Sequence, residues 1–322
     1  MNFLNGILMI DAPASALNNG EGEDNKGAVK KIRTGAREYP YVSSQAVRFW
    51  LRDTLRRYDS EWQASPIYRG KGKQQSYTEG DPIRYWDDDL FGYMRAEKEG
   101  TQTRIAPFRV GTLVSAAPVE IVEDFGVMAR MEGDPVLHGH EFYRTALVGT
   151  FTLDLSAVGT FTVRDRAGYR NLSTAQVEVA QELGLEALKQ GDSYRLPIEE
   201  RLRRVASLLR ALASLEGGAK QTLHHTDVSP AFVCMAVMRG ANNPFAHLIR
   251  GENPPALHEG ALDEALHVYQ DDLLSPVLVG LRQGVMDSAF GPLHERDLDV
   301  NHPRRAFQKG IRLLWEHPEW MA

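Results

Sequence analysis

The hydrophobic pattern predicts strands near the N-terminus and again in the middle of the chain. Residues 3–10 (FLNGILMI) form a short apolar run typical of a buried strand. Residues 106–122 have strand-like composition, and residues 142–164 combine alternation with many β-branched side chains. Residues 14–40, in contrast, are polar and glycine-rich and follow neither the strand nor the helix period, and a stretch of this length is usually functional or disordered.

The pattern after Tyr41 predicts an amphipathic helix with a cationic side. Ser43 or Ser44 suits its N-cap, because a serine hydroxyl accepts a hydrogen bond from an early backbone N–H. With residues placed about 100° apart, Arg48, Arg52 and Arg56 lie within about 60° of Gln45. The opposite side carries residues for a core: Val47, Trp50, Leu51, Thr54 and Leu55.

The remaining elements predict an α+β fold with an antiparallel sheet, helices on one face and two excursions. One excursion is the polar stretch 59–104, with a helical island around residues 89–94; the other is a hairpin-like loop at 123–141. Residues 219–240 read as a loop and a buried strand. Helices are expected at 173–188, at 197–215 with Pro197 at N1 and Gly217–Gly218 at the end, at 263–286 and at 302–317.

Composition places the chain among globular proteins and narrows its setting. It has 322 residues, of which 43% are hydrophobic and 25% charged, and a single cysteine, Cys234, which excludes an intramolecular disulfide framework. Neither a signal peptide nor an apolar run long enough to cross a bilayer is visible, so we expect a cytoplasmic protein without a membrane partner.

The charge is unevenly distributed along the sequence. The formal net charge is -6, which by itself argues against non-specific binding to nucleic acids. Between Lys26 and Arg57, however, nine Lys or Arg residues face two acids, a local balance of +7 that leaves -13 for the rest of the chain. A basic segment on an acidic body suggests one defined anionic ligand; an uneven, solvated helix face is the alternative.

Several residue groups invite a catalytic or metal-binding interpretation, and none has the spacing that such a site needs. They are His224, His225 and Asp227; His138, His140 and Glu141; and Asp87, Asp88 and Asp89. A nucleophile elbow, an HExxH motif and a partnered cysteine are all missing. The aspartates suit a solvated helix start better than a cation site, and Cys234 in FVCMAVM suits a core.

The cations combine better into a groove for single-stranded nucleic acid. Such grooves place cations along the phosphates and apolar groups against the bases. The sequence supplies both kinds of group. The cations are Lys26, Lys30, Lys31, Arg33, the arginines of the helix stripe and the lysine in the segment 217–221, and the apolar groups are those of the tip 125–128. Ser44 and Gln45 can donate to phosphate oxygens without reading bases, so the pattern predicts a sequence-blind phosphate ladder.

Four segments carry a resemblance to a known family. They are SALNNGEGEDNKGAVKKIRTG (15–35), YPYVSSQAVRFWLRDTL (39–55), DDDLFGYM (87–94) and GGAKQTLHHTDVSP (217–230). In this order and spacing they resemble the backbone subunit of Cascade, the RNA-guided surveillance complex of type I CRISPR–Cas antiviral defence. The likeness is to its DevR-like autoregulator branch, associated with type I-B systems, and it covers most of the chain.

The resemblance implies a fold like a right hand. The palm is a modified RRM-like, or ferredoxin-like, antiparallel sheet with helices, mapped to residues 1–58, 106–119 and 142–322. The fingers map to an insertion at 59–105, and the thumb maps to a hairpin at 120–141.

It also implies a role as an RNA-binding scaffold. Several copies form a helical filament along one CRISPR RNA (crRNA), and each thumb displaces one nucleotide, so that guide segments pair with a target DNA strand. The other implied partners are the crRNA 5′-end-binding subunit, the 3′-end processing subunit, and the large and small subunits. Neither enzymatic activity nor a cofactor or metal is implied.

Carried over by position, the resemblance assigns crRNA contacts to residues of three segments. These are Lys26, Lys30, Lys31, Ser44, Gln45, Arg48, Arg52, Lys220 and Gln221. Apolar character alone selects the thumb wedge from Phe125, Val127 and Met128.

Two alternatives remain from the sequence. Related backbone subunits of type III complexes cleave RNA with an aspartate before the first helix, and Asp24 lies near that position, although the surrounding GEGEDNKG lacks the type III glycine pattern. The other alternative is a regulatory protein that binds no RNA.

Overall fold

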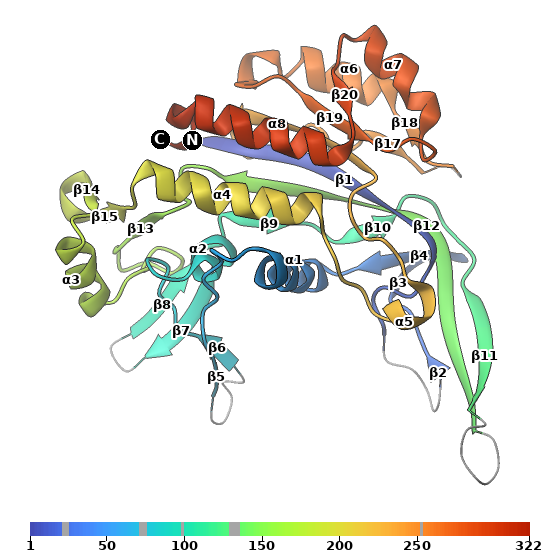
Figure 1. The fold of residues 1–322 in the computed structure, drawn as a ribbon, viewed down its shortest axis with the longest axis horizontal. Helices are drawn as coiled ribbons and strands as arrows, with labels where there is room; N and C mark the ends of the chain where they lie inside the picture. Colours follow the sequence, from blue (N-terminus) through green and yellow to red (C-terminus); the bar gives the residue numbers. More distant parts are fainter. Residues whose placement is uncertain (21–25, 71–75, 98–99, 129–135, 252–253) are drawn as a thin grey trace.

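One large, mostly antiparallel sheet organises the chain (Figure 1). The structure is a computed structural model that describes residues 1–20, 26–70, 76–97, 100–128, 136–251 and 254–322. Its central strands are β1 (Asn2–Ser15), β12 (Val136–Asp154) and β16 (Phe232–Arg239), and β1 pairs antiparallel with both others. The other strands of this sheet are β2 (Lys26–Gly27), β3 (Lys31–Thr34), β4 (Arg37–Val42), β9 (Phe108–Val110), β10 (Leu113–Ser115), β11 (Val122–Met128), β19 (Leu278–Leu281) and β20 (Val300–Asn301).

Helices cover both faces of the sheet, so the expectation of helices on one face is wrong. Alternate residues of β1 enter two separate cores: Leu4 and Leu8 face one, and Ile7 and Met9 face the other. The first core includes side chains of α1 (Ser44–Tyr58), α4 (Ile198–Ala213) and α8 (Pro303–Glu316). The second includes side chains of α6 (Glu259–His267) and α7 (Phe290–Glu295). The α+β class itself is confirmed.

Two of the expected helices are shorter than predicted. The helix expected at 173–188 is α3 (Thr174–Glu182), and Gly184, with φ of 64°, follows its end. The last residues of the predicted helix instead form β14 (Glu186–Leu188). This strand joins β15 (Ser193–Arg195) and β13 (Thr160–Thr162) in a small separate sheet.

The segment 263–286 is likewise only partly helical. It contains the end of α6 and then β19, which pairs with β16 in the main sheet. Every residue of β19 is buried, and a strand buried on both faces shows the same continuous apolar run as a buried helix.

Two arms project from the same side of the main sheet (Figure 1). The first, here called the long hairpin, is β11 paired with the N-terminal part of β12, and β12 continues from it into the sheet without a break. The second, here called the two-hairpin arm, lies within 59–105. It consists of β5 (Ile67–Arg69) with β6 (Ser76–Thr78), β7 (Tyr93–Glu97) with β8 (Gly100–Arg104), and α2 (Trp86–Phe91).

The acidic run of α2 is buried rather than solvated, which corrects the sequence prediction. Asp89 is fully buried and forms ion pairs with Arg104 and Arg204, the latter at 2.7 Å. Asp87 accepts a hydrogen bond from the Ser65 N–H at 2.8 Å. Burial raises the pKa of Asp87 above its ordinary value. The aspartates thus join the two-hairpin arm to α4.

The remaining short elements complete the described chain. They are α5 (Gln221–His224), the pair β17 (Ile249–Arg250) and β18 (Ala256–Leu257), and 3-10 turns at Lys189–Gly191, Gln270–Asp272, Asp287–Ala289 and Pro318–Met321. Cys234 is fully buried, as predicted. None of the helices in the described ranges has the length and apolar character needed to cross a membrane.

Candidate nucleic-acid interface

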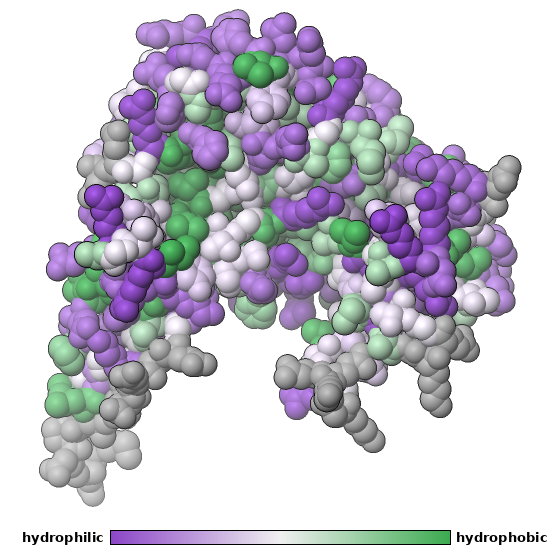
Figure 2. All heavy atoms as spheres, turned by 180° about the vertical axis from the view of Figure 1, so that it is seen from behind, coloured by the Kyte–Doolittle hydropathy of each residue, from purple (hydrophilic) through white to green (hydrophobic). Residues whose placement is uncertain are grey.

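The space between the two arms is a concave surface, and α1 lies at its centre. Figure 2, seen from behind, shows the hollow between the two projecting arms, and Figure 1 shows α1 between them. Three predicted groups of residues meet around this hollow: α1, the strands β2 and β3, and the segment 217–221.

The start of α1 leaves two polar side chains available. The Ser43 Oγ accepts a hydrogen bond from the Ala46 N–H at 3.4 Å, which makes Ser43 the N-cap. Ser44 and Gln45 therefore have no part in capping, and Gln45 is exposed. The opposite side is the core predicted from the sequence, because Val47 and Leu51 are fully buried.

Arg48 and Arg52 of the stripe are half-buried, whereas Arg56 is exposed, and Arg52 faces the two-hairpin arm. The Arg52 guanidinium carbon lies 4.3 Å from the centroid of the Phe91 ring, a cation–π contact. Burial lowers the pKa of Arg52 from its ordinary value, an effect that Asp87 opposes and that neighbouring Arg48 reinforces.

Arg48 is the less satisfied of these two arginines. Its Nε is buried and has no hydrogen-bond partner among the described residues. A buried donor left without an acceptor costs on the order of 1–3 kcal/mol. An anion that bound both arginines would remove that cost and their mutual repulsion.

Two of the predicted lysines are already paired with carboxylates at the base of the long hairpin. The Lys26 Nζ lies 2.5 Å from a Glu123 oxygen. The Lys31 Nζ lies 3.2 Å from Glu141, which also accepts a hydrogen bond from the Val29 N–H at 3.0 Å. These lysines fasten β2 and β3 to the hairpin, and they contribute less net charge than a sequence count suggests. Lys30 is half-buried on the same segment.

The segment 217–221 is fixed directly against α1. Thr54 of α1 accepts a hydrogen bond from the Glu216 N–H at 3.1 Å, and Tyr58 donates to the Glu216 carboxylate at 2.8 Å. Gly217 follows, and a Cβ on it would lie 2.3 Å from the Trp50 Cγ. Gly218 is as closely confined, since its Cβ would lie 2.5 Å from a Leu17 methyl carbon.

Lys220 and Gln221 differ in what they offer to a ligand. Lys220 has a left-handed backbone, with φ of 54°, and is exposed. Its Nζ would lie 4.0 Å from a Cβ on Gly27, which places this cation beside β2. The Gln221 amide, in contrast, donates to the Thr226 carbonyl at 3.0 Å and also to that of Gly217, so it holds its own loop together.

The long hairpin exposes apolar side chains toward its tip. Phe125 and Val127 are 69% and 55% exposed on the same side of β11, while the Met128 side chain lies outside the described residues. Leu137, which faces Val127 across the hairpin, is 65% exposed and was missed in the sequence. Alternation counted backward from Phe142 places Leu137 on the other face of the strand, so the sequence pattern did not select it. Only the pairing of β12 with β11 shows that Leu137 lies opposite Val127.

Sequence reasoning also missed an exposed aromatic residue on α1. Phe49 is 67% exposed, although it follows Arg48 directly. The same helical period places it about 40° from Gln45, on the exposed side. The signal was present, but an aromatic residue in an amphipathic helix is normally assigned to the core.

Two of the candidate histidines, His140 and His224, pack together with Phe142. The ring centroid of His224 lies 5.9 Å from that of His140 and 5.6 Å from that of Phe142, at the base of the long hairpin. Burial lowers the pKa of His224, and His140 and Lys220 lower it further. Within the described ranges, no group of three or more His, Cys, Asp or Glu residues is arranged to hold a metal ion.

Asp227, proposed with these histidines, forms an ion pair with Arg282 at 2.7 Å instead. Asp24, the residue of the nuclease alternative, lies outside the described residues.

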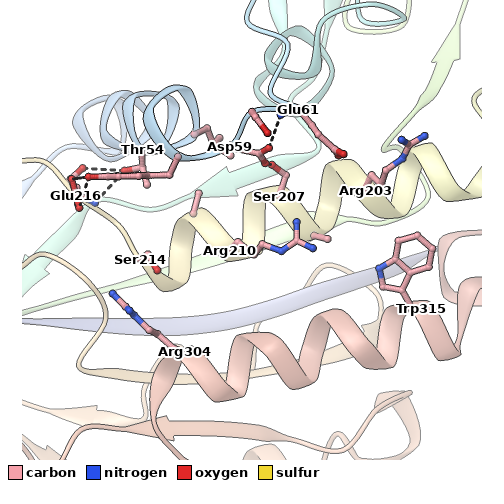
Figure 3. Close-up of a pocket in the computed structure, with 15 residues that line it drawn as sticks. Thr54, Asp59, Glu61, Arg203, Ser207, Arg210, Ser214, Glu216, Arg304 and Trp315 are labelled. Atoms are coloured by element: carbon pink, nitrogen blue, oxygen red, sulfur yellow. Dashed lines mark hydrogen bonds between the residues drawn. The ribbon is translucent and has the colours of Figure 1, made fainter.

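The other side of α1 borders a second hollow, of about 680 Å³, between α1, α4 and α8 (Figure 3). Arg210 of α4 and Arg304 of α8 line it, and Ser207 of α4 donates a hydrogen bond to Asp59 just after α1. Since Thr54 and Asp59 are both held here, the C-terminal half of α1 is fixed from behind. The exposed side of the helix therefore has a defined orientation in the concave surface.

The sequence model of one protein family, described as CRISPR-associated negative auto-regulator DevR/Csa2, matches residues 9–255. A search of curated proteins finds no match. One similar solved structure is a chain of a CRISPR RNA-guided surveillance complex, with 13% identity, a TM-score of 0.56, and coverage of 97% of this chain and 99% of that one. A chain of a pre-nicking CRISPR RNA-guided surveillance complex has 12% identity, a TM-score of 0.58 and the same coverage. At these identities the likeness shows the fold.

Proposed function

Because the chain belongs to the DevR/Csa2 family of CRISPR-associated proteins, we propose that it is the backbone subunit of a type I-B Cascade complex. In this role several copies line up along one crRNA. Each copy grips the RNA backbone in the concave surface between its arms and presents guide segments for pairing with a target DNA strand. The solved structures of similar fold come from RNA-guided surveillance complexes, which supports this assignment.

One observation carries the proposal: the half-buried pair Arg48 and Arg52, with an unpartnered Nε on Arg48, lies on α1 in the concave surface, and the segment that carries Lys220 is held against another side of the same helix. Arginine guanidinium groups match phosphate oxygens in geometry and charge. The residues are about 170 positions apart in sequence, and contacts between Trp50 and Gly217 and between Thr54 and Glu216 bring them together.

The chemistry of these side chains suits a phosphate backbone better than a particular base sequence. Arginine, lysine, serine and glutamine side chains contact phosphate and sugar, and such contacts set position without carrying sequence information. In RNA-guided complexes, specificity comes from base pairing while the protein recognises the backbone and its shape. A sequence-blind cationic surface is therefore what a guide-holding subunit requires.

The proposal extends to the organisation of the fold and its partners. The main sheet with its helices is an RRM-like palm, the two-hairpin arm is the fingers insertion, and the long hairpin is the thumb, with Phe125 or Val127 available as a wedge against the RNA. In this scheme the chain binds crRNA without cleaving it. Further copies and the other Cascade subunits, namely the end-binding, processing, large and small subunits, complete the complex.

The direct test is co-expression with a CRISPR array, purification of the chain, and sequencing of the RNA that stays bound. We expect spacer-containing RNAs of defined length, with spacer sequences represented without base preference. Recovery of the protein free of nucleic acid, at low salt and with the array transcribed, would contradict the proposal and support a regulatory protein without RNA. Loss of complementary RNA in the presence of a divalent metal, prevented by Asp24→Ala, would instead support the nuclease alternative.

A further inference from the structure

Phe49 is an apolar residue exposed at the edge of the cationic stripe of α1. Its helical neighbours three and four positions away are Gln45, Ala46, Arg52 and Asp53, so the arginines lie to one side of it and Asp53 to the other. A large exposed aromatic side chain loses the stabilisation of about 2 kcal/mol that burial would bring. The exposed ring therefore adds little to the stability of the fold and is available to a ligand.

A groove of about 1,200 Å³ opens beside Phe49 on the side away from Arg48 and Arg52. Phe49 of α1 lines it together with residues 217–219. Asn19 and His225, which also line it, are exposed. The groove thus has enough volume for a nucleotide and combines an aromatic side chain with polar ones.

The charges in this groove disfavour phosphate. Of the described residues that line the groove, the one with a Lys or Arg side chain is Arg57. It is paired with Asp53 at 2.5 Å and with Glu216 at 3.6 Å. Asp227, also in the lining, is paired with Arg282. The groove therefore has little free positive charge, whereas Arg48 and Arg52 across the ridge of α1 have it.

These two environments suit the two parts of a nucleotide. The arginine side of α1 attracts a phosphate. The other side, where the charges are paired, accepts a neutral base, which can contact the Phe49 ring. Stacking on an aromatic ring is tolerant of sequence, because every base has a π-face.

Resting on the proposed function, we infer that Phe49 stacks against a nucleobase of the bound RNA, and that the groove beside α1 is a base-binding subsite. The subsite adds affinity for unpaired bases to a surface that would otherwise bind only phosphates. It also predicts that one base per copy is turned toward the protein at α1, separately from any base displaced at the long hairpin.

The test measures the affinity of full-length protein for an oligouridine of about 12 nucleotides and for the same oligomer with abasic sites. Four variants are compared with the wild type: Phe49→Ala, Phe49→Leu, Phe49→Trp, and the double variant Arg48→Ala with Arg52→Ala. We expect Phe49→Ala to bind intact RNA about ten-fold more weakly. Phe49→Leu should recover little of that loss, since it keeps apolar character without stacking, and Phe49→Trp should bind as tightly as the wild type.

The abasic oligomer separates stacking from other effects. There the Phe49 variants should bind like the wild type, while the double arginine variant should stay weakened. Equal affinity of Phe49→Ala and the wild type for intact RNA would overturn the inference, and so would an equal loss on both oligomers. A loss seen only on longer RNA, where copies adjoin, would assign Phe49 to a contact between copies and overturn it as well. If the wild type binds neither oligomer, the proposed function itself fails. A cooperative melting transition well above the assay temperature shows that each variant is folded.

Discussion

The Cα of Gly217 lies against the indole of Trp50, so closely that a Cβ on the glycine would be 2.3 Å from the Trp50 Cγ. Gly217 also has φ of 151°, a backbone conformation that side chains disfavour. This contact sets the distance between α1 and the segment that carries Lys220. Any residue larger than glycine must separate the two halves of the cationic surface.

Gly217→Ala is expected to destabilise the protein by roughly 1–3 kcal/mol, because both overpacking and an unfavourable φ act at this site. RNA affinity should fall as well, since the segment that carries Lys220 moves away from α1. The matched control is Gly291→Ala, where a Cβ would meet nothing within 4 Å. Urea unfolding measures the stabilities, and equal values for the two variants would show that the contact does not constrain the segment.

Removal of Arg48 and Arg52 together should weaken RNA binding and lower its dependence on salt. Each lost phosphate contact should reduce the slope of log affinity against log salt by about one unit. Arg52→Ala should also cost about 0.5–2 kcal/mol of stability, because the cation–π contact with Phe91 is lost.

The matched control for this pair is Arg210→Ala with Arg304→Ala, which removes the same charge from the hollow on the other side of α1. That variant should keep the slope of the wild type. If the two double variants lower the slope equally, long-range charge rather than contact at α1 accounts for the effect.

Asp89→Asn should destabilise the protein strongly, by roughly 3–5 kcal/mol, because the buried Arg104 would lose its carboxylate partner and the buried Arg204 would keep only Glu200. Chemical denaturation checks this value. Asp165→Asn is the control, since the Asp165 side chain is 94% exposed beside Arg170 and should cost less than about 0.5 kcal/mol. Similar small losses for both variants would restore the interpretation of a solvated acidic run.

His224 should make the stability depend on pH below its ordinary pKa. Because burial lowers the pKa of His224 in the folded state, the unfolded chain binds the proton more readily. The stability is therefore complete above the unfolded pKa of about 6.5 and is lost as the pH falls below it.

His224→Phe should reduce this pH dependence, because it keeps a ring against Phe142 but cannot be protonated. Urea unfolding at about pH 7.5 and about pH 5.5 compares the variant with the wild type. His302, whose pKa is also lowered by burial, contributes to the dependence that remains in both proteins. An unchanged difference between the two pH values would show that His224 does not titrate in this range.

Local pattern predicted α1 well, because a helix and its cap depend on residues close in sequence. The cap at Ser43, the buried side with Leu51 and the exposed side with Gln45 all follow from spacing along one segment. The apolar side also predicted which face of the helix packs against the core. The family resemblance, carried by short ordered motifs, is confirmed by the match over residues 9–255.

Where charges sit relative to one another depended on the tertiary structure. Lys31 appeared free in the sequence, and pairing of β12 with β2 brings Glu141, 110 positions away, to neutralise it. The sequence suggested that Asp89 is solvated. In the structure it is buried and paired with Arg104 and Arg204, which come from other segments.

The sequence by itself determined an α+β chain, an amphipathic cationic helix and the family to which the chain belongs. The tertiary structure decided which of the cations stay available, that Gly217 joins Lys220 to α1, and that Phe49 borders a groove. The physical reason is that periodicity and capping act over a few residues of one backbone. Charge pairing, burial and groove shape arise between segments that only sheet pairing and helix packing bring together.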